Sequence, residues 1–384
     1  MRSILKIIGG LLIGITAGLT IAALITIIFT DTTLPEFISK LCSMKAVESM
    51  LVVLVGVVAF IVSIVIIVTF HEAGHLVGGL LSGYEFVSFR IFNFTFIKVN
   101  GKIKVKRFSI TGTGGQCLLA PPDLPVDKIP TSLYLTGGIL ANITLLIMVF
   151  PFFFLKLNPF IVEILTIFCL TDLFLLIING IPMKLNGMGN DGYDWLNMRH
   201  NLLTKRAVMT QLRSNAMIQN GVRPKDMPEE WFEWKTDIDY KNPLEVSIPF
   251  MHASRLVDEM DWEQAYIEHE DLYSHNADIM PLYVNEMACE LVFLALATHR
   301  QERARQLLDD NLKKYIDTYQ KTMSSKQRVL CAIDLWLNND REKALKKYEW
   351  LKANQAKYLL QGEVKSDLAI MHKILNKVNK TNTI

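Results

Sequence analysis

The stretch that decides the fold runs from Met50 to Leu81 and reads MLVVLVGVVAFIVSIVIIVTFHEAGHLVGGLL. Up to Phe70 it carries no charge and is long enough to cross the roughly 30 Å hydrocarbon core of a bilayer. His71 and His75 follow four residues apart, so both imidazoles can reach one zinc ion, and Glu72 between them can hold the attacking water. Ionisable side chains inside hydrocarbon are costly unless they have a function. The stretch therefore predicts a zinc site in a membrane helix. The alternative is that the two His only pack in the protein core, beside a Glu whose side chain extends to water, and the cost of burying these groups disfavours it.

The charge density changes partway along the chain. Residues 1–198 hold 13 Lys and Arg and 11 Asp and Glu, whereas residues 199–384 hold 27 of each kind. This contrast indicates a membrane-embedded first half and a soluble second half. The net charge is only +2, which gives no reason to expect a nucleic acid as partner. The five Cys lack C-x-x-C spacing and are odd in number, which argues against a disulfide framework and a thiolate zinc site.

Four apolar stretches are long enough to span a bilayer: about 4–29, 50–81, 133–155 and 160–181. The first has Arg2 and Lys6 at its front and is too long for the apolar core of a signal peptide, so we expect it to be retained. Basic residues cluster at 98–107 and again after the fourth stretch. The positive-inside rule then places the His pair towards the cytoplasmic side and the C-terminal half in the cytoplasm. The chain is predicted to be a multi-pass protein of the cell membrane.

A β-hairpin is predicted between the second and third stretches, at about 84–110. Asn100-Gly101 is a strong turn signal, and Lys alternates with Ile103 and Val105 after it. The hairpin is either a plain connection or an open sheet edge onto which an unwound substrate adds as a strand. The following segment, from Gly112 to Cys117, lacks the context of a phosphate-binding loop and is expected to be a flexible loop.

A catalytic zinc needs a third protein ligand, which must come from elsewhere in the chain. The fourth stretch ends in Asn179-Gly-Ile-Pro182, and Asp191 and Asp194 follow. Pro182 and the nearby glycines break the helix and allow the chain to turn back towards a cavity. Both Asp residues are candidates, although an Asp beside Gly is commonly a solvated turn residue.

Residues 50–195 resemble the site-2 protease family of intramembrane zinc metalloproteases. Three features occur in the family's order: H-E-x-x-H in an early span, a Gly-Gly-x-x-x-Asn element opening the next, and Asn-x-x-Pro followed by Asp-Gly. The resemblance implies a proteolytic site built from zinc ligands His71, His75 and Asp191, the general base Glu72, and Gly138, Asn142, Asn179 and Pro182 near the zinc or the substrate. Asn142 is then a candidate donor to the substrate or its oxyanion.

The chain departs from the family's pattern at the third ligand. The family usually places this Asp eight positions after the Asn of Asn-x-x-Pro, whereas Asp191 comes twelve after Asn179. Leu185-Asn186-Gly187 stands at about the expected place, and Asn is a poor zinc ligand. An insertion before Asp191 would resolve the difference, and Asp194 remains the alternative. Asp172, within the fourth stretch, either lines a water path to the zinc or bonds to a neighbouring hydroxyl or backbone group.

The second half shows helical periodicity from about Pro249 onward. Similar short segments begin at Asp261, Arg300 and Arg341, 39 to 41 residues apart, which suggests stacked helix pairs with a groove for a peptide or protein partner. The alternative is a helical domain with accidental periodicity. The sequence thus predicts a mainly α protein: a polytopic membrane helix bundle of four spans with a β-hairpin insertion (1–199), a linker (200–248), and a soluble all-α helical-repeat-like domain (249–384).

Three functions are compatible with these features. The leading hypothesis is an intramembrane zinc endopeptidase, with one Zn²⁺ per chain, that cleaves transmembrane or membrane-associated peptides near the cytoplasmic face. The second is a membrane-anchored scaffold with a structural or inactive zinc site and a partner-binding helical domain. A metal transporter is the third, and it has no use for Glu72 between the two His.

Overall fold

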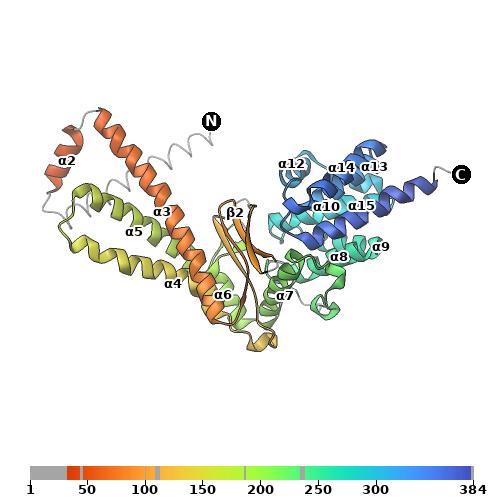
Figure 1. Ribbon diagram of the computed structural model, residues 1–384, viewed down its shortest axis with the longest axis horizontal. Coiled ribbons are helices and arrows are strands. Elements are labelled where there is room, and N and C mark those ends of the chain that lie inside the picture. The colour runs from red at the N-terminus through yellow and green to blue at the C-terminus, as the bar shows by residue number, and fades with distance from the viewer. Residues whose placement is uncertain are drawn as a thin grey trace. The chain divides into compact units, whose positions relative to one another are not determined.

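The computed structural model describes residues 33–43, 46–99, 101–108, 113–185, 187–233 and 238–381. It is mostly helical and contains a small antiparallel sheet (Figure 1). The chain forms two compact units, one with residues up to His75 and Thr136–Ile181, the other with Leu76–Leu135 and Pro182 onward. This division differs from the expected boundary at 199, because the sheet belongs to the unit that also holds the C-terminal helices.

Three described helices are long and apolar enough to cross a membrane. They are α3 (Ala46–Leu81), α4 (Ser132–Val149) with the 3-10 turn η2 (Phe150–Phe154) after it, and α5 (Pro159–Gly180). Large apolar side chains point outward on each of them, with Val53, Ile147 and Phe174 more than 60% exposed. Exposed apolar surface on this scale suits lipid and not water. Three of the four predicted spans therefore have matching helices, and the stretch 4–29 lies outside the described residues.

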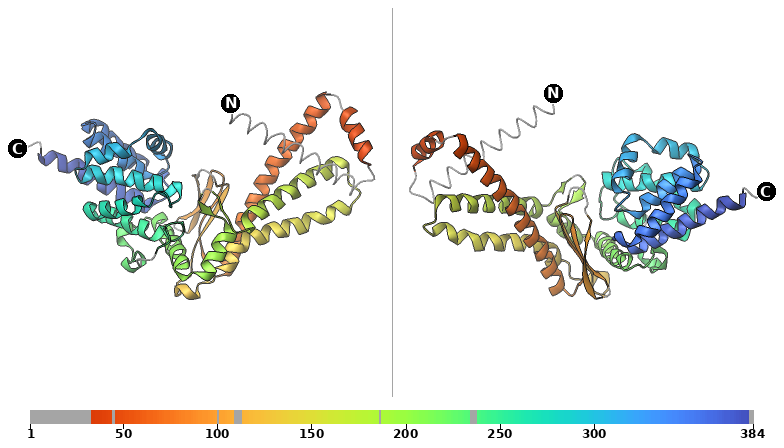
Figure 2. Two further views of the ribbon diagram at one scale, coloured as in Figure 1. Left: turned by 180° about the vertical axis from the view of Figure 1, so that it is seen from behind. Right: turned by 45° about the horizontal axis from the view of Figure 1, so that its top comes forward.

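Small residues allow α3 and α4 to approach closely. A Cβ added to Gly74 would lie 2.2 Å from the carbonyl oxygen of Gly137, and one added to Gly137 would lie 2.3 Å from that of Gly74. Backbones can pack this closely only where side chains are missing, which is the usual way that helices associate in membranes. Helices α4 and α5 lie side by side (Figures 1 and 2), and Asn158 begins α5 by accepting a hydrogen bond from the Phe160 backbone N–H at 2.9 Å.

The predicted hairpin is part of a four-stranded antiparallel sheet with the order β3-β2-β1-β4. Strands β2 (Phe94–Val99) and β3 (Lys102–Arg107) form the expected pair, and Gly101 has the positive φ of +76° that a tight turn requires. The expected loop from Gly112 to Cys117 is wrong in its second part, because β4 (Gly115–Ala120) pairs there with β1 (Glu85–Ile91). Cys117 and Leu119 alternate with less buried residues, a strand signal that the glycines before them obscured.

A long helix occupies the segment expected to be a linker. Helix α7 (Leu202–Gln219) packs against β4, and its Met209 and Leu212 belong to an apolar cluster with Tyr84 and Leu119 of the sheet region. Short helix α6 (Asp191–His200) precedes it. The segment expected to be a linker therefore begins with a packed helix, because α7 has apolar residues that the sheet buries.

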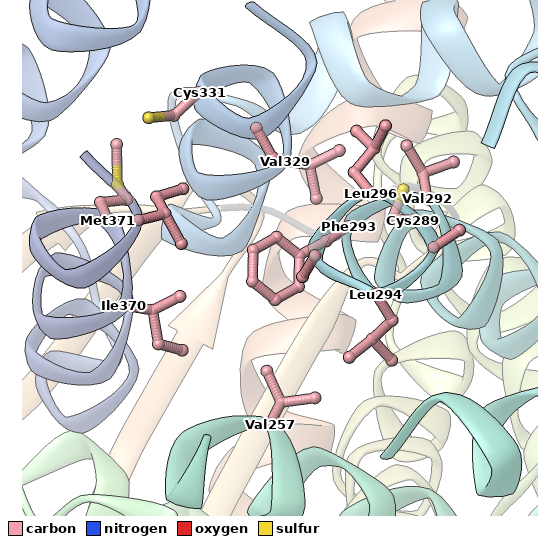
Figure 3. Close-up of a cluster of buried hydrophobic side chains, with 14 of the residues drawn as sticks. Val257, Cys289, Val292, Phe293, Leu294, Leu296, Val329, Cys331, Ile370 and Met371 are labelled. Atoms are coloured by element: carbon pink, nitrogen blue, oxygen red, sulfur yellow. The ribbon is translucent and has the colours of Figure 1, made fainter. Parts of the chain in front are cut away.

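Eight described helices follow from Ser247 onward and form what we call the helical domain: α8 (Ser247–Glu259), α9 (Trp262–Ser274), α10 (Pro281–Ala297), α11 (Gln301–Leu307), α12 (Asp310–Tyr319), α13 (Ser324–Trp336), α14 (Arg341–Asn354) and α15 (Gln361–Thr381). Its core gathers around α10, where Phe293 is fully buried among side chains from α8, α13 and α15 (Figure 3). The three similar segments each open a helix, and their Ala265, Ala304 and Ala344 are all 0% exposed. This equivalence favours a repeat, which stays a prediction.

Candidate metal centre

The two His of the H-E-x-x-H sequence converge on one point. Both lie in α3 and are less than 10% exposed. Their Nε2 atoms are 3.2 Å apart, and their rings stand at 79° to each other. Two nitrogens bound to one tetrahedral zinc at about 2.0–2.1 Å lie roughly 3.3 Å apart. The spacing of four residues on a helix thus gives the separation that the metal needs.

Gly138 of α4 leaves the space in front of both imidazoles free. A Cβ built on this glycine would lie 2.6 Å from Nε2 of His71 and 2.6 Å from Nε2 of His75. Any side chain here would fill the position between the two nitrogens. From the sequence, Gly138 was expected near the zinc only because of the family resemblance. The geometry explains why the residue is a glycine, since a side chain would occupy the space between the two Nε2 atoms.

Asp191 is the acidic residue expected to complete the ligand set of the His pair. It is the first residue of helix α6, and Asp194 lies three residues further along the same helix. A carboxylate and two imidazoles are a common ligand set for catalytic zinc, so the chemistry of the three residues suits this metal, and the role of Asp191 stays a prediction.

The extra residues before Asp191 form a short hairpin. Strands β5 (Lys184–Leu185) and β6 (Met188–Gly189) pair with each other, and Gly187 has a φ of +85°. The backbones of Met183 and Asn190 are hydrogen bonded, with Asn190 N–H donating to the Met183 carbonyl at 3.1 Å. Met183 and Asn190 are therefore adjacent at the base of the hairpin. The hairpin thus accommodates the additional residues between Asn179 and Asp191.

Asn190 fixes the start of the helix that carries Asp191. Its side-chain oxygen accepts hydrogen bonds from the backbone N–H groups of Tyr193 at 2.9 Å and Met183 at 3.2 Å. Asp191 is then the first residue of α6, where the helix dipole favours a negative charge. The next acid, Asp194, has a pKa raised to about 7 by burial and by the charge of Asp191. It is partly protonated at neutral pH, which makes it a poorer metal ligand.

Two further polar residues lie inside the long apolar helices α4 and α5. Asn142 of α4 is fully buried, and neither atom of its amide group has a hydrogen-bond partner within the described part of the chain. It lies one helical turn from Gly138 on the same face. An unmet buried amide costs about 1–3 kcal/mol, so its retention agrees with the expected role as a donor to substrate.

Asp172 of α5 is also fully buried, and its carboxyl oxygens find no hydrogen-bond partner within the described ranges. Within those residues no hydroxyl or backbone group bonds to it, and its place on a water path to the metal stays a prediction.

Asn179 and Pro182 lie at the end of α5. Asn179 is half-buried in the last turn, and Pro182 follows Ile181, whose extended conformation ends the helix. Their predicted contact with substrate stays a prediction. Comparisons with protein-family models, curated proteins and solved structures gave no match for this chain.

Proposed function

We propose that this protein is an intramembrane zinc endopeptidase, with a site like that of the site-2 protease family. One observation carries the proposal: the Nε2 atoms of His71 and His75 lie 3.2 Å apart, in front of a glycine that leaves the space between them open. Asp191 is the proposed third ligand, because a carboxylate with two imidazoles is a common ligand set for catalytic zinc. The three apolar helices support cleavage of peptide segments in or at a membrane.

The chain's residues would divide the chemistry among them. His71, His75 and Asp191 would hold one zinc ion, which when bound polarises the scissile carbonyl and lowers the pKa of the attacking water. Glu72 takes the proton from that water and passes it to the leaving amine. Asn142 donates its amide N–H to the carbonyl oxygen, where negative charge develops. Glu72 is only 9% exposed, so little water screens its charge, and its electrostatic interactions at the site are stronger for that reason.

A helical substrate must unwind before it is cleaved, because its amide bonds are enclosed in the helix's own hydrogen bonds. Strand β3 offers a place for the unwound segment. It is an outer strand of the sheet, most of its residues are exposed, and within the described residues only β2 pairs with it. An extended peptide can add to such an edge through main-chain hydrogen bonds. We further infer that cleavage occurs near the cytoplasmic face, with the helical domain in the cytoplasm.

The test is cleavage of a single-span model substrate by the full-length protein in proteoliposomes, with zinc content measured on the same sample. We expect about one zinc per chain and a loss of about 10²–10⁴-fold in rate for Glu72→Gln, with the zinc retained. Glu85→Gln is the matched control, because Glu85 is an exposed acid in β1, and its activity should not change. Full activity in Glu72→Gln would rule the proposal out, and tight zinc without any cleavage would favour a scaffold with a structural metal.

A further inference from the structure

The helical domain and α7 enclose a cavity far from the membrane helices in sequence. Its volume is about 300 Å³, and its walls come from α7, α8, α10, α13 and α15. Ligand pockets typically have about 300–1,000 Å³, so this one suits a short segment or a small molecule. Phe250, Met251 and Tyr283 supply apolar surface, and charged residues lie on the side formed by α10, α13 and α15.

The charged residues that line this cavity form a network of ion pairs, and one carboxyl group of the cavity does not take part in a pair with any residue that the structure describes. Arg328 bonds through Nε to Asp367 at 2.7 Å and through Nη2 to Glu290 at 2.7 Å. Lys326 bonds to Glu286 at 2.7 Å. Glu363 also lines the cavity, where its side chain is partly exposed, and it makes no hydrogen bond or ion pair within the described residues. The network therefore contains four carboxyl groups and two cations.

Two polar groups in the walls are buried and unsatisfied. Arg328 is 3% exposed, and its Nη1 has no hydrogen-bond acceptor in the described part of the chain. Ser214 of α7 is 2% exposed, and its hydroxyl likewise has no partner there. Leaving a buried donor unmet costs free energy, and more so when the group is charged. Both residues line the cavity, so a ligand that enters it can satisfy them.

We propose that this cavity binds a short peptide segment that carries a cationic group, whose charge pairs with Glu363 and whose backbone carbonyl accepts a hydrogen bond from Nη1 of Arg328. The cation is an amino terminus or a Lys or Arg side chain, which share the same chemistry. A polyamine or a metal ion offers no acceptor to Arg328, and an anion meets the excess of carboxyl groups. A peptide offers the donor, the acceptor and the apolar side chains together.

The state of Glu363 gives the proposal a second readout. Burial and the charges of Asp367, Glu286 and Glu290 raise its pKa to about 8, while Lys326 acts in the opposite direction. Without ligand the carboxyl is therefore largely protonated at neutral pH. A bound cation favours the ionised form, so binding should release part of a proton at pH 7.

The experiment is calorimetric titration of the full-length protein in detergent with defined peptides. They are acetyl-Leu-Lys-Leu-amide, its Gln counterpart without charge, Leu-Gln-Leu-amide with a free amino terminus, and lysine alone. We expect binding of the Lys peptide or the free-amino peptide, about ten- to a hundredfold weaker binding of the neutral peptide, and heats that depend on the buffer's ionisation enthalpy. The two charged peptides distinguish the sources of the cation.

The matched variants are Glu363→Gln, which mimics the protonated carboxyl and should fold normally, and Glu302→Gln, an exposed acid of α11. Glu363→Gln should weaken binding about ten- to a hundredfold and abolish the buffer dependence, whereas Glu302→Gln should change neither. Equal binding of charged and neutral peptides, absence of binding at millimolar concentration, or equally tight binding of lysine alone would each overturn the proposal. None of these outcomes depends on the zinc site.

Discussion

At the scale of single residues, Gly138 controls the space in which a metal would lie. Because its added Cβ would lie 2.6 Å from Nε2 of both His71 and His75, Gly138→Ala should lower zinc affinity by about ten- to a hundredfold or more. Zinc retained after dialysis against a chelator is the measurement. Gly56→Ala in α3, the helix of the two His, is the control, since among the described residues its Cβ would meet only Ile167, at 3.9 Å. Unchanged zinc retention in Gly138→Ala would contradict the proposed position of the ion.

The third ligand is the second question at this scale. Asp191 is the proposed ligand, and Asp194 is the alternative, whose pKa is raised to about 7 so that it is partly protonated at neutral pH. Asp191→Ala should therefore abolish zinc retention and cleavage, because two imidazoles alone bind zinc weakly. Asp194→Ala should leave both largely intact. The same dialysis and cleavage assays decide the matter, and the reverse result would move the ligand to Asp194.

At the scale of elements, ion pairs hold the helices of the helical domain together. Arg328 of α13 joins Glu290 of α10 to Asp367 of α15, and all three side chains are nearly fully buried. Arg328→Met would leave two buried carboxylates without their cation, which costs about 3–5 kcal/mol. We expect a corresponding fall in the free energy of unfolding, measured by urea denaturation of the protein in detergent.

An exposed pair provides the control for Arg328. Lys346 and Glu342 of α14 form an i,i+4 pair in which both side chains are more than 70% exposed. Lys346→Met should cause no measurable change, because water and salt screen such pairs. Equal effects of the two substitutions would mean that the buried network does not stabilise the contact of α13 with α10 and α15.

The raised pKa of Glu363, in α15, leads us to expect that the stability of the protein depends on pH. Its pKa is about 8 in the folded protein, against an ordinary value of 4.5. Between these values the folded state keeps a proton that the unfolded state has lost, so the free energy of unfolding falls as the pH rises. Glu363→Gln should remove this component, and the variant should gain about 3 kcal/mol over the wild type between pH 5 and pH 8, at about 1.4 kcal/mol for each pH unit over which only the folded state keeps the proton. A constant difference between the two proteins across this range would refute it.

At the scale of the whole molecule, the prediction concerns the sides of the membrane. The distribution of basic residues predicts that Lys156 faces outward and that the helical domain faces the cytoplasm. Lys156→Cys should react with a membrane-impermeant thiol reagent in intact cells, whereas Lys346→Cys should react only after permeabilisation. Labelling of Lys346→Cys in intact cells would reverse the topology and put the His pair nearer the outer face.

The sequence by itself determined the local features of this protein. The apolar length of α3, α4 and α5 predicts spans because each helix satisfies its own backbone. The spacing of His71 and His75 predicts their convergence because four residues make about one helical turn. The turn at Gly101 predicts the hairpin for a similarly local reason, since few residues besides glycine accept its φ.

Only the tertiary structure decided the features that depend on distant parts of the chain. The small β5–β6 hairpin pairs residues just before Asp191, and no local sequence pattern predicts that pairing. Strand β4 and helix α7 form because each buries the other's apolar residues, so segments that read as loop and linker become ordered. The cavity with Glu363 and Arg328 arises from five helices far apart in sequence. Packing over such distances sets which polar groups are buried together, and hydrophobic periodicity does not encode it.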